Sequence, residues 1–207
     1  MDAEMIRDAA LAAGGLLTGE IGGPSVRPYQ PEGVWEAVAM PESNTHDYRQ
    51  DHGERLYRRS LYTFWKRSAP PASLDILNAP TRETCTVHRE RTDTPLQALV
   101  TLNDPQFVEA ARALAQAVLK APGDASDARL DAIALRVLSR PFRPEERSIV
   151  RASLSRLEAH YRDHPDEAKE LIAVGEWKPD PSIEPRTLAA WTMLANELMN
   201  LDEFLNK

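Results

Sequence analysis

The stretch NDPQFVEAARALAQAV at residues 103–118 carries the clearest structural signal in the chain. Asparagine or aspartate as a cap, followed by proline at the first helical position, is a common way to begin a helix. Apolar residues then recur at helical spacing from Phe107 to Val118 and form one stripe. We therefore predict a helix that starts at Pro105 and packs through this stripe.

Working outward, caps, prolines and apolar periodicity predict further helices on both sides. The stretch at residues 55–67 is rich in aromatic residues, which also suit a strand, and we interpret it as a helix. The loop at 41–53 and the polar segment at 81–94 separate the early elements. The additional helices are predicted at residues 2–17, 34–38, 127–138, 144–161, 165–174 and 185–205, and one more begins at Pro95 and includes Val100.

These elements predict a fold that is mainly α. Glycine and proline are dense between residues 21 and 31 and exclude regular structure there. We expect an irregular Pro/Gly-rich first half packed on a multi-helix second half. The expected organisation is a single domain over residues 1–207, with an irregular, basic and aromatic part at 1–93 and a helical part at 94–207.

The composition, with 42% hydrophobic and 28% charged residues, is typical of a folded globular chain. The single cysteine, Cys85, excludes an internal disulfide. No apolar run has the length of a membrane span. The acidic start Met1-Asp2-Ala3-Glu4 lacks the features of a signal peptide. We therefore expect neither a membrane span nor a signal peptide in this chain.

The net charge of −7 is unevenly distributed. Residues 55–91 hold eight bases and three acids, which leaves a net charge of −12 on the rest of the chain. Such asymmetry suggests an anionic ligand or an acidic partner surface. The alternative is that the bases pair internally with acidic helices and that the aromatic residues form core. The predicted binding residues are Arg58, Arg59, Tyr62, Trp65, Lys66, Arg82, Arg89 and Arg91.

Several segments together resemble a known family. They are IGGPSV at 21–26, YQP at 29–31, YRRSLYTFWKR at 57–67, PTRETC at 80–85, RERT at 89–92, TPLQAL at 94–99, LNDPQF at 102–107 and LDE at 201–203. The chain resembles the C-terminal domain of unknown function of large secreted planctomycete-type proteins, which usually follows a cytochrome-c-like module and a second domain of unknown function. The resemblance implies a fragment of a longer protein, an extracytoplasmic location and work on environmental polymers. It implies no established activity and no catalytic residues.

Cofactor motifs are weak. Covalent attachment of haem needs two cysteines and a histidine as C-x-x-C-H, and the run from Cys85 to His88 lacks the first cysteine. Cys85 and His88 could form a zinc site with ligands from His46, His52, Asp47 and Asp51. However, one C-x-x-H pair is more often a buried structural cysteine beside a hydrogen-bonded histidine. We therefore predict no haem, no zinc and no other cofactor in this chain.

The leading functional interpretation is a non-catalytic extracytoplasmic interaction domain. Its expected partners are the upstream domains of the same full-length protein and an anionic or carbohydrate polymer, whereas nucleic acid is not expected. One alternative is a hydrolase or metal-assisted enzyme. A second alternative is a purely structural cap of a multidomain chain. The residues of the alternative enzyme site are His46, His52, Glu83, Cys85 and His88.

Overall fold

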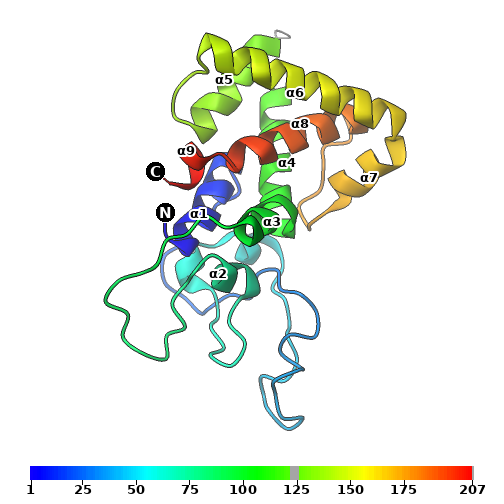
Figure 1. Ribbon diagram of the computed structural model, residues 1–207. Helices are drawn as coiled ribbons and strands as arrows, with labels where there is room; N and C mark the ends of the chain where they lie inside the picture. Colours follow the sequence, from blue (N-terminus) through cyan, green and yellow to red (C-terminus); the bar gives the residue numbers. More distant parts are fainter. Residues whose placement is uncertain (122–125, 207) are drawn as a thin grey trace. The chain divides into compact units, whose positions relative to one another are not determined.

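The computed structural model describes residues 1–121 and 126–206, and it confirms the mainly helical fold class (Figure 1). No helix within these residues is both long and apolar enough to cross a lipid bilayer. The helices are α1 (Ala3–Gly14), α2 (Ala72–Ile76), α3 (Pro95–Asn103), α4 (Pro105–Leu119), α5 (Ser126–Val137), α6 (Pro144–Asp163), α7 (Pro165–Ala173), α8 (Pro185–Met199) and α9 (Asp202–Leu205), with the 3-10 turns η1 (Gly53–Tyr57) and η2 (Ser60–Tyr62).

The chain forms two compact units. Unit 1 comprises residues 1–9 and 17–100, and unit 2 comprises residues 10–16 and 101–207. The helices α1 and α3 each contribute residues to both units. The chain passes from unit 1 to unit 2 for the last time at Val100–Thr101.

The core of unit 2 is built around α4 and α8, and Figure 1 shows α8, in orange, crossing α4. Asp104 caps α4 by accepting a hydrogen bond from the Gln106 amide at 3.0 Å. Phe107 and Leu114 on α4 are buried, as is Trp191 on α8. The helices α6 and α7 pack against α8. The predicted start of α4 and its buried stripe are therefore confirmed.

A close approach of two backbones explains one glycine of unit 2. A Cβ atom added to Gly14 would lie only 2.6 Å from the carbonyl oxygen of Ala110 on α4. The next residue, Gly15, has a φ of 75°, in the left-handed region that commonly ends helices. The Gly14-Gly15 pair therefore both permits contact with α4 and ends α1.

Helix α4 also carries a buried ion pair. The side chains of Glu109 and Arg112 are fully buried, and Arg112 Nη2 lies 3.7 Å from Glu109 Oε1. Arg112 donates hydrogen bonds to the carbonyl oxygens of Ile172, at 2.6 Å, and of Val174 and Trp177. Glu109 Oε1 accepts a hydrogen bond from the Trp177 amide at 2.6 Å. The pair therefore holds the segment after α7 against α4.

Two helices predicted in the first half are wrong. Residues 55–67 form η1 and η2, followed by extended backbone. Val26 is the reason: its amide donates to the Tyr62 carbonyl at 2.8 Å, and its carbonyl accepts from the Phe64 amide at 2.7 Å. Residues 34–38 form hydrogen-bonded turns rather than a helix, although Trp35 is buried.

The helix predicted at residues 185–205 is interrupted. Helix α8 ends at Met199 and α9 begins at Asp202. The Asn200 side-chain amide donates to the Asn196 carbonyl at 3.0 Å, while the Asn200 backbone amide bonds to Glu197 in a tighter turn at 3.1 Å. Asparagine side chains compete in this way with the backbone hydrogen bonds that would continue a helix.

Candidate binding groove

An open groove with a volume of about 750 Å³ lies in unit 1. It is lined by the loop at residues 38–45, by residues 66–68 and by Glu83. The loop contributes apolar side chains, Val38 and Met40, together with the carboxylate of Glu42. The groove therefore combines exposed apolar surface with charges of both signs, and we call it the unit 1 groove.

Lys66 connects the two main walls of the unit 1 groove. Its Nζ donates a hydrogen bond to the Thr45 carbonyl at 2.7 Å and lies 4.8 Å from the centroid of the Trp35 ring. Trp35 is buried and packs edge-on against Tyr48 and at a tilt against Phe64. Lys66 thus connects the loop at residues 38–45 to the extended stretch that follows η2, in which Lys66 itself lies.

Arg67 has a different environment from its neighbour. Its side chain is exposed in the groove, and it has no hydrogen-bond or ion-pair partner among the residues that the structure describes. An exposed guanidinium offers several donors in one plane and pairs readily with carboxylate, sulfate or phosphate. Arg67 is therefore the lining residue best suited to bind an anionic group.

A cation–aromatic pair adjoins the lining residues in sequence. The guanidinium of Arg82 lies 4.6 Å from the centroid of the Trp65 ring, and Trp65 Nε1 donates to the Thr81 carbonyl at 3.0 Å. Arg82 has a φ of 63°, which is uncommon for a residue with a side chain. These contacts position the backbone that carries Glu83 into the groove.

Two other predicted binding residues serve the fold of unit 1. Arg58 is 2% exposed and donates to the carbonyl oxygens of Glu20, Gly22 and Pro24. Its guanidinium lies 3.9 Å from the centroid of the Tyr62 ring, and the Tyr62 hydroxyl accepts from the Gly22 amide at 2.8 Å. Arg58 and Tyr62 therefore hold the glycine- and proline-rich turn in place.

The remaining predicted arginines lie beside Asp2 and two acids of α1. Arg89 Nη1 lies 2.8 Å from Glu4 Oε2, and Arg91 Nε lies 3.1 Å from Asp2 Oδ1. Arg59 is more loosely placed, with Nε 3.8 Å from Asp8 Oδ2. Part of the positive charge of residues 55–91 is therefore matched within unit 1.

Sequence reasoning missed a second buried arginine of unit 1. Arg7, on the first turns of α1, is 2% exposed. It donates to the Leu56 carbonyl at 2.7 Å, to the Arg58 carbonyl at 2.9 Å and to the Ser60 hydroxyl at 3.1 Å. These acceptors lie far away in sequence, so no local pattern marks Arg7 as a buried residue.

The residues of the alternative enzyme site lie in different surroundings. Cys85 is exposed, contrary to the expected buried structural cysteine, and His52 and His88 are also exposed. Every residue from 81 to 96 is exposed. His46 Nδ1 lies 2.6 Å from Asp47 Oδ1, and this hydrogen bond lowers the pKa of Asp47. Among these predicted residues, the structure brings Glu83 into the unit 1 groove.

Unit 2 has a cavity of its own, with a volume of about 530 Å³, lined by residues of α6, α8 and α9. A charged cluster forms one side. Arg140 Nη1 donates to Glu146 Oε2 at 2.7 Å, and its Nη2 donates to Glu203 Oε2 at 2.5 Å. The bond from Arg140, together with the Arg143 amide, lowers the pKa of Glu146 to about 2.

The lowered pKa of Glu146 predicts an acid-sensitive contribution to stability. A carboxylate whose pKa is lower in the folded state stabilises the fold above its unfolded pKa, near 4.5, and this contribution is lost as the pH falls toward 2. We expect Glu146→Gln to be less stable than the wild type at pH 6, with the difference shrinking between pH 4.5 and 2. Urea unfolding midpoints across this range measure the effect. A difference that stays constant would contradict the prediction, and Glu145→Gln is the matched control.

Comparison with known proteins identifies a family and nothing more specific. Residues 1–154 match the family described as PSD1, protein of unknown function (DUF1553). No curated protein and no solved structure matches the chain.

Proposed function

We propose that this chain, which belongs to the DUF1553 family of proteins of unknown function, is a non-catalytic interaction domain that binds an acidic polysaccharide in the unit 1 groove. The proposal places it in an extracytoplasmic, planctomycete-type multidomain protein. Upstream domains of that protein are its second proposed partner.

The observation that carries the proposal is the environment of Arg67. Its exposed guanidinium has no hydrogen-bond or ion-pair partner among the described residues, and it lies in an open groove of about 750 Å³. Lys66 lines the same groove, and the Trp65–Arg82 pair adjoins it in sequence. Guanidinium groups bind carboxylates and sulfates through paired hydrogen bonds. Carboxylates and sulfates are the anionic groups of acidic sugars.

The acids of the groove favour an acidic sugar polymer over nucleic acid. Glu42 and Glu83 line the groove together with Lys66 and Arg67, so its lining carries both charges. Nucleic acids present closely spaced phosphates, which two carboxylates would repel. A polysaccharide alternates anionic groups with hydroxyls, and carboxylates accept hydrogen bonds from hydroxyls. Half-buried Trp65 adds an aromatic surface of the kind that packs against apolar faces.

The test compares two pairs of arginines in unit 1. Arg67→Ser with Arg82→Ser removes the guanidinium that lines the groove and the one that stacks on Trp65, while Lys66 stays. We expect at least about tenfold weaker binding of a uronate- or sulfate-bearing polysaccharide, equivalent to about 1.4 kcal/mol. Arg49→Ser with Arg59→Ser removes two exposed arginines that do not line it, and this control should bind as the wild type does. Titration by calorimetry measures both.

Salt dependence provides the second measurement. Exposed charges are screened over about 8 Å at physiological ionic strength, so binding should weaken as salt rises. Equal losses in the two double variants would contradict the groove and favour a wider basic surface. Single-stranded nucleic acid that binds more tightly than every acidic polysaccharide would contradict the proposed ligand class.

A further inference from the structure

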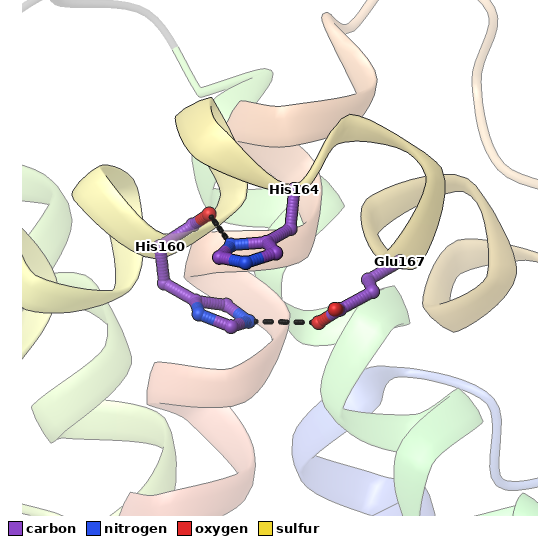
Figure 2. Close-up of side chains that lie close together, drawn as sticks. All are labelled: His160, His164 and Glu167. Atoms are coloured by element: carbon purple, nitrogen blue, oxygen red, sulfur yellow. Dashed lines mark hydrogen bonds and ion pairs between the residues drawn. The ribbon is translucent and has the colours of Figure 1, made fainter.

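Three side chains with metal-binding atoms meet where α6 passes into α7 (Figure 2). His160 lies in the last turn of α6, His164 caps the junction, and Glu167 lies in the first turn of α7. One ligand atom from each residue lies within 4.8 Å of the ligand atoms of the other two. No other three His, Cys, Asp or Glu side chains within residues 1–121 and 126–206 bring their ligand atoms this close together. We propose that this trio binds a divalent transition-metal ion of the zinc class.

A hydrogen bond prepares His164 for this role. Its Nδ1 lies 2.8 Å from the His160 backbone carbonyl, and a dashed line marks this hydrogen bond in Figure 2. A carbonyl oxygen only accepts, so Nδ1 carries a proton, and in the neutral ring Nε2 then holds the lone pair. Histidines that bind metals commonly donate their other ring N–H to a carbonyl or carboxylate, which fixes the tautomer and the ring orientation. His164 therefore already has the tautomer that a metal at Nε2 requires.

His160 and Glu167 provide the other two ligand atoms. His160 Nε2 lies 2.9 Å from Glu167 Oε2, and a proton between them completes this hydrogen bond. A metal ion takes the place of that proton, which passes to solvent or to the other ring nitrogen. The ring of His160 stacks on that of His164, with centroids 4.5 Å apart and planes 24° apart. Both imidazoles therefore lie beside the carboxylate, and each ring has to turn about its side-chain bonds to direct a nitrogen at one shared ion.

The ligand set selects the class of ion. Two imidazole nitrogens and one carboxylate oxygen are a set that zinc uses in proteins, with water at the fourth position. Calcium and magnesium prefer oxygen ligands throughout. The side chain of His160 is 46% exposed and that of Glu167 is 56% exposed, so an ion can reach the trio from solvent.

The bound ion would join two helices of unit 2. Ala168 and Ile172 on α7 are buried, and α7 packs against α8. A ligand that binds only the folded state stabilises it in proportion to the logarithm of its concentration over the dissociation constant. The proposed role of the ion is therefore to clamp the corner between α6 and α7.

The experiment uses the full chain, stripped of metal with a chelator and titrated with zinc against a chromophoric competitor. We expect one zinc ion per chain. At a free zinc concentration about 100-fold above the dissociation constant, the Tm should rise by roughly 5–10 °C. His160→Ala with His164→Ala should bind at least about tenfold more weakly and lose the rise in Tm.

A matched control tests the other candidate ligands of the chain. Cys85→Ser with His88→Ala removes an exposed thiol and an exposed imidazole, and it should keep the zinc affinity of the wild type. Far-UV circular dichroism establishes that both double variants are folded, which the exposure of the four side chains favours. The proposal is overturned if wild-type protein binds no stoichiometric zinc at micromolar concentrations. It is equally overturned if the His160/His164 variant keeps the site.

Discussion

Replacing Glu109 with alanine is expected to lower the free energy of unfolding by about 3–5 kcal/mol. The change leaves the guanidinium of Arg112 fully buried without its carboxylate and deprives the Trp177 amide of its acceptor. Arginine cannot lose its charge in a protein, so the charge stays uncompensated. Urea denaturation followed by far-UV circular dichroism measures the loss. Glu158→Ala, an exposed glutamate of α6, is the control.

A double variant separates the buried charge from the packing around it. Glu109→Leu with Arg112→Met removes both charges and keeps apolar volume, so it should lose less stability than Glu109→Ala. Its remaining loss comes from the carbonyls of Ile172, Val174 and Trp177, which Arg112 no longer satisfies. A loss below about 1 kcal/mol in Glu109→Ala would show that the pair does not hold this segment.

The second large effect is expected at Arg58. Arg58→Met keeps much of the side-chain volume but removes the donors that satisfy the carbonyls of Glu20, Gly22 and Pro24. A buried acceptor left without a partner costs about 1–3 kcal/mol, so the total loss should reach about 3 kcal/mol or more. Thermal unfolding measures it.

Arg59→Met is the matched control for Arg58→Met. Arg59 is 54% exposed, and its nearest acid, Asp8, lies 3.8 Å away. Surface substitutions of this kind change stability by about 0.5 kcal/mol or less. If Arg58→Met proved as stable as Arg59→Met, Arg58 would not hold the turn at residues 20–24 and would be available for a ligand.

Most helix starts could be predicted because their causes are local. Prolines at 105, 144, 165 and 185 each stand at the first helical position, as the sequence analysis expected. A cap or a proline acts within one turn of helix and needs no partner from elsewhere in the chain. The helix is interrupted after Met199 because the side chain of Asn200 bonds to the Asn196 carbonyl. The sequence analysis missed this interruption, because the residues around Asn200 did not signal it.

The unit 1 groove could be predicted only in part. The sequence analysis selected Trp65, Lys66 and Arg82 from the basic and aromatic stretch, and these residues line or adjoin the groove. It did not select Arg67, whose lack of a partner depends on which acids the fold brings near. The trio of His160, His164 and Glu167 was also missed, because its members belong to α6, to the junction and to α7, so helical spacing does not place them on one face.

Arg58 and Arg59 show where the information in the sequence ends. Local sequence determined helix starts, the apolar stripe of α4 and the mainly helical fold class. Two adjacent arginines in an apparently helical stretch look equivalent in sequence, yet one is buried and the other is exposed. The tertiary structure decided between them, because it brings the carbonyls of residues 20–24 to Arg58 and pairs the adjoining Val26 with Tyr62 and Phe64. Burial of a charge depends on such distant partners, whereas helix starts depend on neighbours within one turn.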